Sequence, residues 1–184
     1  KAEGVTNVMF LGEANAYSLF FMPAAEQQQY RPKYGLSTAQ TPALFLQDIV
    51  PPEQLQNAIG MGWMPTADVD AGQDPGPITK TQTLCLDIQR KAGQDMSNRQ
   101  AAFQAGLYCG GLLWLQQVMG TAPSLSSDGI ASAAAGLGST FTPAVTFGAS
   151  FGASKVDAPV LYRDFAWKNG SNKAVYVSGN KRMK

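Results

Sequence analysis

The chain of 184 residues contains no histidine and only two cysteines. Without histidine there is no Ser-His-Asp triad, no Cys-His pair and no imidazole general base. A zinc site would depend on carboxylates, which fit structural zinc poorly, and the cysteines form no CxxC pair. The GxxxxGK[ST] loop of P-loop enzymes is also missing from the sequence. We therefore expect a protein that is not an enzyme and that needs no metal or other cofactor.

Charge and long apolar runs are sparse as well. Charged residues make up 15% of the chain and hydrophobic residues 45%, and the formal net charge is +1. This is a globular composition, and the scattered lysines and arginines form no basic stripe of the kind that binds nucleic acid. The longest apolar stretch, residues 105–115, is interrupted by glycine and falls short of the roughly 20 residues that cross a bilayer. We expect a globular protein that does not bind nucleic acid.

Strand and helix patterns alternate in the first third of the chain. Residues 6–11 form a continuous apolar run that ends at Gly12, which is typical of a buried parallel strand. Thr41-Pro42 is typical of a helix start, with a capping side chain followed by proline at the first helical position. The alternation predicts parallel strands joined by right-handed crossovers, and hence an α/β fold. The predicted elements are, in order, strand 6–11, helix 15–29, strand 33–36, helix 41–49 and strand 58–63.

Two cysteines fall on a predicted helical hairpin. Residues 64–78 contain three prolines and indicate a loop or crossing segment. Helices are predicted over 80–92 and from a Ser97 cap to Met119, and their short connection favours an antiparallel pair. Cys85 and Cys109 lie on the two arms, so geometric reach favours a disulfide between them. Two reduced cysteines in a core are the alternative.

The C-terminal part ends in a predicted β-hairpin. An alanine-rich stretch over 126–137 predicts a short third helix, and residues 138–158 are rich in small residues and irregular. The runs 160–168 and 173–178 are β-prone and flank an Asn-Gly pair at 169–170. Asn-Gly between two such runs is a strong hairpin signal.

The order of these elements resembles that of a known family. The segments that carry the resemblance are Val8-Met9-Phe10-Leu11-Gly12 with the helix after it, Ala58-Ile59-Gly60-Met61-Gly62-Trp63, the helix 105–119, and the terminal hairpin around 163–170. Together they resemble the second half of the type I periplasmic solute-binding proteins, the branched-chain amino-acid-binding group that feeds ABC importers. The stretches 21–26 and 30–34 look like an actinobacterial branch of this family.

The resemblance implies a two-lobed architecture of which this chain is the C-terminal portion. It implies a three-layer parallel sheet with flanking helices, with residues 5–64 and 147–180 in the second lobe and 65–146 in the first. It also implies an extracytoplasmic receptor, secreted or lipid-anchored, that binds a small polar solute such as an amino acid and delivers it to a membrane permease. The alternative is a ligand-sensing domain of a receptor or transcription regulator with the same fold.

In this family the ligand lies between the lobes, at the carboxyl ends of strands. The polar residues that follow the first two predicted strands, and an aromatic residue that ends the third, are therefore the candidate ligand contacts: Glu13, Asn15, Ser37, Thr38, Gln40 and Trp63. The family commonly places an acidic residue after the second strand, where this chain has none, and Glu13 is the nearest replacement for that charge. The plainer alternatives are that Asn15 and Thr41 are helix caps and that Ser37-Thr38 is an ordinary loop.

The resemblance also predicts an unmatched surface. The helices at 80–119 normally cover a sheet that this sequence does not contain, so their apolar face would be left without a partner. Burial of each large apolar side chain is worth roughly 1.5–3 kcal/mol. We therefore expect another chain, either the missing N-terminal part of the same protein or a second copy, to bury the face that carries Leu84, Ile88, Leu107, Leu112 and Leu115.

Overall fold

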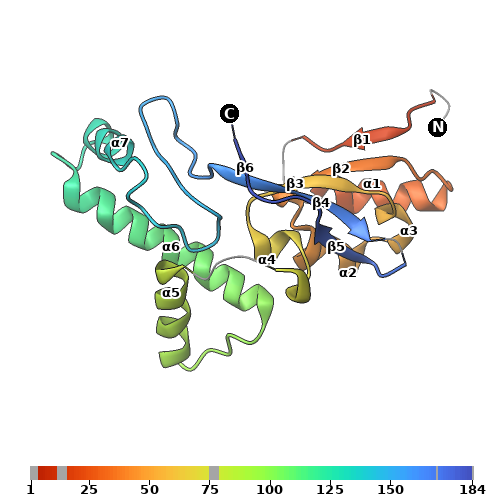
Figure 1. Ribbon diagram of the computed structural model, residues 1–184, viewed down its shortest axis with the longest axis horizontal. Helices are drawn as coiled ribbons and strands as arrows, with labels where there is room; N and C mark the ends of the chain where they lie inside the picture. Colours follow the sequence, from red (N-terminus) through yellow and green to blue (C-terminus); the bar gives the residue numbers. More distant parts are fainter. Residues whose placement is uncertain (1–3, 12–15, 75–78, 169, 184) are drawn as a thin grey trace. The chain divides into compact units, whose positions relative to one another are not determined.

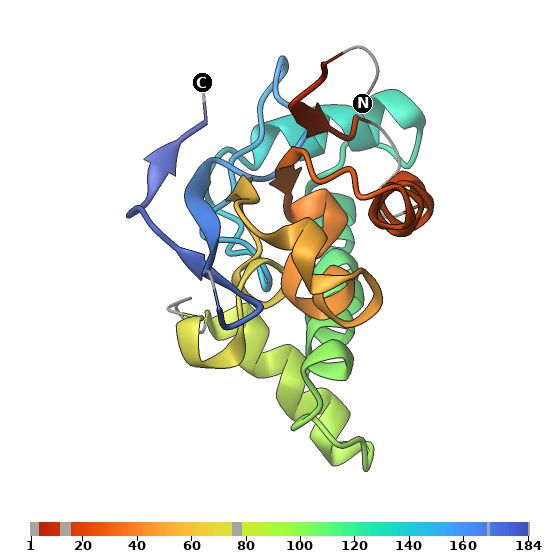
Figure 2. The same ribbon diagram turned by 90° about the vertical axis from the view of Figure 1, so that its right-hand side faces the viewer.

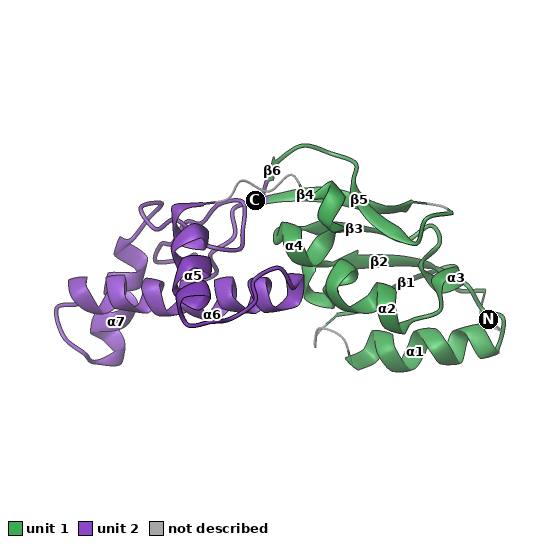
Figure 3. Ribbon diagram, turned by 90° about the horizontal axis from the view of Figure 1, so that it is seen from below, with its two compact units in different colours: residues 1–75, 162–181 green, residues 76–161, 182–184 purple. Residues whose placement is uncertain are grey.

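The computed structural model describes residues 4–11, 16–74, 79–168 and 170–183. The chain divides into two compact units, which Figure 3 colours separately. Unit 1 contains residues 1–75 and 162–181, and unit 2 contains residues 76–161 and 182–184. The assignment of 5–64 with 147–180 to one lobe, and of 65–146 to the other, stays a prediction.

Unit 1 is built on parallel strands, as the alternating pattern predicts. Strand β2 pairs in parallel with both β1 and β3, and the strand order across the sheet is β1-β2-β3-β4-β5. Figures 1 and 2 show these strands side by side, with helices in the connections. The strands are β1 Asn7–Met9, β2 Lys33–Ser37 and β3 Ile59–Gly62. The connecting elements are α1 Ala16–Gln27, the 3₁₀ turn Thr38–Gln40, the π-helical turn Pro42–Leu46, α2 Gln47–Ile49 and α3 Pro52–Leu55.

The C-terminal hairpin completes this sheet and confirms the Asn-Gly signal. Strand β4 (Leu161–Lys168) runs antiparallel to both β3 and β5 (Lys173–Tyr176), and the short β6 (Lys181–Arg182) pairs with β4. Gly170 adopts a φ of 79°, a left-handed conformation that suits glycine in a tight turn. The fold class is therefore confirmed: a mixed α/β structure whose parallel strands are flanked by helices and which ends in a β-hairpin.

The core of unit 1 lies between the helices and one face of the sheet. Alternation along β2 places Tyr34 and Leu36 in this core. Gly60 lacks a side chain because an added Cβ would overlap the ring of Phe165. The cluster of buried hydrophobic residues consists of Met22, Tyr34, Leu36, Leu46, Val50, Leu55, Ala58, Val69, Phe165, Trp167 and Ala174. On the other face of the sheet, Met9, Ile59 and Met61 are exposed.

Local details of unit 1 differ from the sequence prediction at three places. The run 6–11, predicted as a buried strand, forms only the short β1 at the edge of the sheet, where Met9 is exposed. Thr41 adopts a left-handed conformation (φ 41°) and makes no side-chain capping bond to the turn that begins at Pro42, because it closes the preceding 3₁₀ turn. The crossing segment contains a helical turn, α4 (Pro65–Asp68), and a 3₁₀ turn over Ala71–Gln73. Proline at the first helical position explains how a proline-bearing stretch starts a helix.

Unit 2 is helical and contains the predicted hairpin. Helix α5 (Lys80–Lys91) packs against α6 (Arg99–Thr121), and α7 (Ser127–Gly136) follows. The cap of α6 is Asn98 rather than Ser97, because the Asn98 side-chain oxygen accepts the Ala101 N–H at 2.9 Å. None of the helices in the described parts of the chain is long and apolar enough to cross a membrane.

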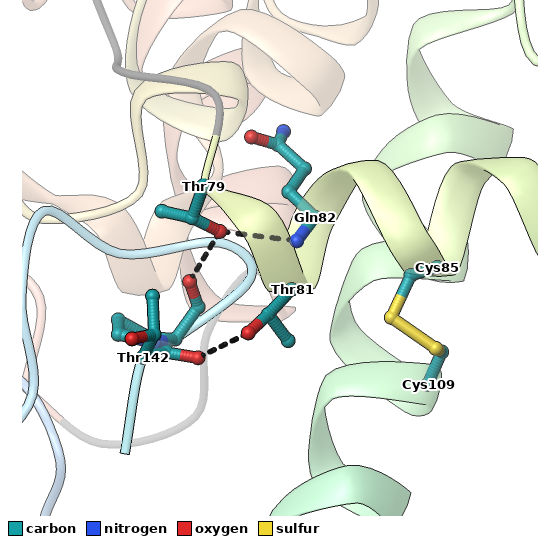
Figure 4. Close-up of a disulfide and its surroundings, with 7 residues drawn as sticks. Thr79, Thr81, Gln82, Cys85, Cys109 and Thr142 are labelled. Atoms are coloured by element: carbon teal, nitrogen blue, oxygen red, sulfur yellow. Dashed lines mark hydrogen bonds between the residues drawn. A yellow bond between two sulfur atoms is a disulfide. The ribbon is translucent and has the colours of Figure 1, made fainter. Parts of the chain in front are cut away.

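A disulfide joins the two arms of this hairpin. Cys85 and Cys109 are bonded, with their Cα atoms 5.6 Å apart (Figure 4). The start of α5 is also fixed, because the Thr79 hydroxyl caps the helix and donates to Pro143 O at 2.7 Å. The Thr81 hydroxyl similarly donates to Thr142 O at 2.7 Å. Unit 2 therefore has its helical hairpin cross-linked and tied to the later loop.

The apolar face that the sequence singled out on this hairpin is exposed in the chain. Its five residues are between 38% and 68% exposed: Leu84, Ile88, Leu107, Leu112 and Leu115. That another chain covers this face stays a prediction.

Candidate ligand-binding site

A groove of about 620 Å³ lies in unit 1 where β1, β2 and β3 reach their carboxyl ends. This edge of a parallel sheet is where α/β proteins commonly bind ligands. Its walls are largely apolar, with Phe10, Leu11, Leu36, Met61, Trp63, Phe165 and Val177 among the lining residues. Polar lining side chains come from Ser37, Gln40 and Asp164.

Ser37 and Gln40 line the groove and also form its turn. The Gln40 Oε1 atom accepts the Ser37 N–H at 2.9 Å and lies 3.0 Å from the Ser37 hydroxyl oxygen. The Ser37 oxygen accepts the Ala39 N–H at 3.2 Å, so the pair makes a reciprocal capping box around the 3₁₀ turn. Gln40 is buried whereas Ser37 is half-buried, which leaves Ser37 the more accessible of the two. Their contact with a ligand stays a prediction.

Thr38 lies behind the groove and supports its wall. Its side chain is not among the lining residues, and the residue is buried. The Thr38 hydroxyl oxygen accepts the Trp63 N–H at 2.8 Å, which links the end of β2 to the residue after β3. Trp63 itself is half-buried and lines the groove. Thus three predicted residues line the groove and Thr38 stands behind it. Glu13 and Asn15 lie outside the described residues.

Asp68, at the end of α4, is the residue that sequence reasoning missed. Its carboxyl group is fully buried and accepts the Met64 N–H at 2.9 Å and the Tyr176 hydroxyl at 2.8 Å. Burial raises the pKa of Asp68 to about 7, against the opposing effects of the Thr38 and Tyr176 hydroxyls and the Met64 N–H. Burial also raises the pKa of the Tyr176 phenol, and the neighbouring Asp68 adds to that rise.

The charge that lines the groove is paired. Asp164 is the only ionisable side chain among the described lining residues, and it forms an ion pair with Lys181. The hydrogen bond from the Lys181 ammonium group to Asp164 raises the pKa of Lys181. Nearby, the Arg163 guanidinium lies 5.4 Å from the centre of the Tyr176 ring and donates to Asn180 Oδ1 at 2.6 Å. The groove therefore suits a ligand with a largely apolar body and few hydrogen-bonding groups.

Part of this wall comes from residues far away in the sequence. The β3–β4 register places Asp164 opposite Met61, and Phe165 and Val177 also belong to the C-terminal hairpin region. No local pattern marks these residues as site residues, because their position depends on strand register. The described residues contain no group of three or more His, Cys, Asp or Glu side chains placed to hold a metal ion.

The comparisons with known proteins agree with the fold and do not identify a ligand for this chain. The sequence matches no protein-family model and no curated protein. Among solved structures, the chain is similar to a branched chain amino acid ABC transporter from Thermus thermophilus with bound valine, with a TM-score of 0.58 and 11% identity. The match covers 99% of this chain and 47% of that chain, so this chain spans about half of its length. At this identity the likeness concerns the fold, which is that of part of a type I periplasmic-binding protein.

Proposed function

We propose that this chain provides one wall of the ligand site of an extracytoplasmic solute-binding protein that serves an ABC importer. The observation that carries the proposal is the groove at the carboxyl ends of β1, β2 and β3, with Trp63 and Ser37 in its lining. The fold likeness supports a two-lobed binding protein, and the Cys85–Cys109 disulfide fits an oxidising compartment. The ligand is a small molecule, such as an amino acid or a related compound.

The lining favours the apolar part of such a ligand. Trp63, Met61 and Ile59 offer apolar surface, and the Ser37 hydroxyl, which donates to Gln40, can still accept a hydrogen bond. The Asp164 carboxylate is already paired with Lys181, so it is not set aside for a ligand ammonium group. Specificity for an amino acid would therefore depend on groups from elsewhere in a two-lobed protein.

One wall binds weakly, because closure of two lobes surrounds a ligand and supplies contacts from both sides. We expect dissociation constants of about 1 mM for the 184-residue chain, which correspond to a binding free energy of about −4 kcal/mol. Amide chemical shifts of the ¹⁵N-labelled chain measure such binding during titration with valine, phenylalanine and the uncharged isovaleramide. Shifts that follow Ser37 and Trp63 support the proposal, and shifts confined to unit 2 contradict it.

A matched pair of variants sharpens this test. Trp63→Ala removes an aromatic wall of the groove and should abolish the shifts. Tyr108→Ala removes an exposed aromatic ring from α6 in unit 2 and should leave them unchanged. Equal loss in both variants would mean that the shifts report something other than the groove. The alternative of a sensing domain uses the same groove and differs in its partner, which would be a signalling chain in place of a permease.

The exposed face of the α5–α6 hairpin supports a second, separate part of the proposal. We propose that another chain covers Leu112 and its apolar neighbours, either the portion of a two-lobed protein beyond the matched 47% or a second copy of this chain. Light scattering distinguishes them, because self-association doubles the 19.6 kDa mass of the chain. Leu112→Lys should abolish any such doubling.

A further inference from the structure

Three segments of unit 1 meet at one buried carboxyl group. Asp68 Oδ2 accepts the N–H of Met64, directly after the groove residue Trp63, and the hydroxyl of Tyr176, at the end of β5. The Trp63 N–H itself donates to Thr38, the first residue after β2. The wall residue Trp63 is thus held from behind by bonds that reach three strands.

The packing around this group is close. An added Cβ at Gly62 would overlap the Asp68 carboxylate, so glycine at this position makes room for it. The carboxyl group therefore lies directly against the last residue of β3, which precedes Trp63. Displacement of the carboxyl group would release the Met64 N–H and alter the path of the chain at Trp63.

The hydrogen bonds of Asp68 are uneven between its two oxygens. The bonds from Met64 and Tyr176 both go to Oδ2, whereas Oδ1 is buried without a hydrogen-bond partner, although the Thr38 hydroxyl also lies close enough to lower the pKa of the group. A buried carboxylate whose second oxygen has no donor is costly, and protonation lowers that cost because a neutral carboxyl group is cheaper to bury than a charge. Burial therefore favours the neutral carboxyl group, and it outweighs the hydrogen bonds, which favour the ionised one.

The charge nearest in effect to Asp68 also favours its neutral form. Asp74 is the charged residue that acts on it directly, and its negative charge opposes ionisation. The 3₁₀ turn Thr38–Gln40 and the π-helical turn Pro42–Leu46 contain no ionisable residue. On β5, Tyr176 is the titratable neighbour, and Arg163 lies over its ring.

We propose that Asp68 is a positioning residue of the groove and that its protonation state controls the Trp63 wall. The neutral carboxyl group holds Met64 and Tyr176 without a buried charge and keeps Trp63 in its groove-lining position. Ionisation places an unneutralised charge in the core, and the cost of that charge favours opening of the packing around Asp68, even though the hydrogen bonds to a carboxylate are individually stronger. The effect on ligand affinity rests on the proposed function, whereas the effect on Trp63 does not.

A titration without ligand tests this role of Asp68. The amide signals of Met64 and Trp63 are followed from pH 5 to 9 in the ¹⁵N-labelled chain. Burial raises the pKa of Asp68 to about 7, so both signals should move with a midpoint near that pH. Asp68→Asn should flatten the titration, and Asp48→Asn, which removes an exposed carboxylate in α2, should leave it as in the wild type. A wild type without this midpoint, or an Asn variant that retains it, overturns the proposal.

A second measurement separates positioning from simple support of the fold. Asp68→Asn keeps the two acceptor bonds and should keep the Trp63 amide near its low-pH position, whereas Asp68→Ala should shift it at every pH. Binding of isovaleramide, which does not titrate in this range, should weaken by about threefold or more between pH 6 and pH 8 in the wild type and stay constant in Asp68→Asn. A probe that binds at neither pH contradicts the proposed function, and the amide titration still decides the role of Asp68. A probe that binds equally at both pH values overturns the regulatory part.

Discussion

The two units are stabilised in different ways. The buried cluster of unit 1 contains eleven hydrophobic residues from helices and strands that are distant in the sequence. The buried cluster of unit 2 contains three, Val118, Ala133 and Leu137, with partly buried residues around them. Unit 2 has the disulfide and close helix–loop contacts in addition. A small core needs such a cross-link, because little apolar area is available to offset the entropy of folding.

The difference also explains where buried polar groups occur. In unit 1, Gln54 Nε2 donates to Glu26 at 2.7 Å and to Tyr30 O at 3.0 Å, and the Tyr34 hydroxyl donates to Gln54 Oε1. Arg31 completes the network with an ion pair to Glu26, which lowers the pKa of that carboxyl group. A large core holds such a network and a buried carboxyl group in fixed positions. We therefore expect separate unfolding transitions for the units, which variants in each unit should move independently.

The largest expected effect is on the core of unit 1. Phe165→Ala removes a fully buried ring that packs on Gly60 and should lower the unfolding free energy of unit 1 by about 3–5 kcal/mol. Urea unfolding followed by hydrogen exchange of unit 1 amides measures this loss. Phe20→Ala, at a side chain that is 80% exposed, should change stability by less than about 0.5 kcal/mol. Equal effects of the two variants would contradict the assigned core.

The next effect is the loss of the cross-link in unit 2. Replacing Cys85 and Cys109 by serine opens a loop with a sequence separation of 24 and should destabilise unit 2 by about 3 kcal/mol. Hydrogen exchange in α5 and α6 should speed up, whereas exchange in β2 and β3 should stay unchanged. Reductant should reproduce the loss in the wild type and have no effect on the double variant. Equal destabilisation of both units would show that they do not unfold separately.

The net pH dependence of unit 1 is a smaller effect, because carboxylates with opposite shifts offset part of it. Because folding raises the pKa of Asp68 from 3.8 to about 7, the folded state binds an extra proton between these values. The contribution of Asp68 to the unfolding free energy should therefore fall as pH rises from about 4 to about 7, by up to about 4 kcal/mol, and level off above. Carboxylates whose pKa is lowered, such as Glu26, act in the opposite direction, so the wild type is compared with Asp68→Asn. Identical pH profiles of the two proteins would refute this contribution.

The smallest effects test the close packing of unit 2. An added Cβ at Gly110 would lie 2.9 Å from the Ala144 Cβ, whereas one at Gly111 meets no heavy atom within 4 Å. Gly110→Ala should therefore destabilise unit 2 by about 1 kcal/mol, because crowding exceeds the gain in helix propensity. Gly111→Ala should stabilise α6 by up to about 1 kcal/mol. Thermal unfolding measures the difference in stability between the two variants. Stabilisation by both would show that the loop at Ala144 moves away from the added methyl group at little cost in free energy.

The local pattern determined most of the elements of this protein. Apolar runs, glycine and proline placement and the Asn-Gly pair predicted the parallel strands, the helical hairpin and the C-terminal hairpin, all of which the structure contains. These signals are readable because backbone periodicity and turn chemistry act over a few residues. The cap of α6 at Asn98 and the conformation of Thr41 show the limit, since a shift of one residue changes a cap without changing the helix.

Only the tertiary structure decided how the groove is assembled. Strand register brings Asp164 and Val177 beside Ser37 and turns Thr38 into the core, and no sequence pattern carries register over more than 100 residues. The role of Asp68 likewise depends on Tyr176, 108 residues away, and on burial, which the sequence does not display. Propensity is local and acts along the chain, whereas the chemistry of a buried group is set by neighbours that only the folded chain brings together.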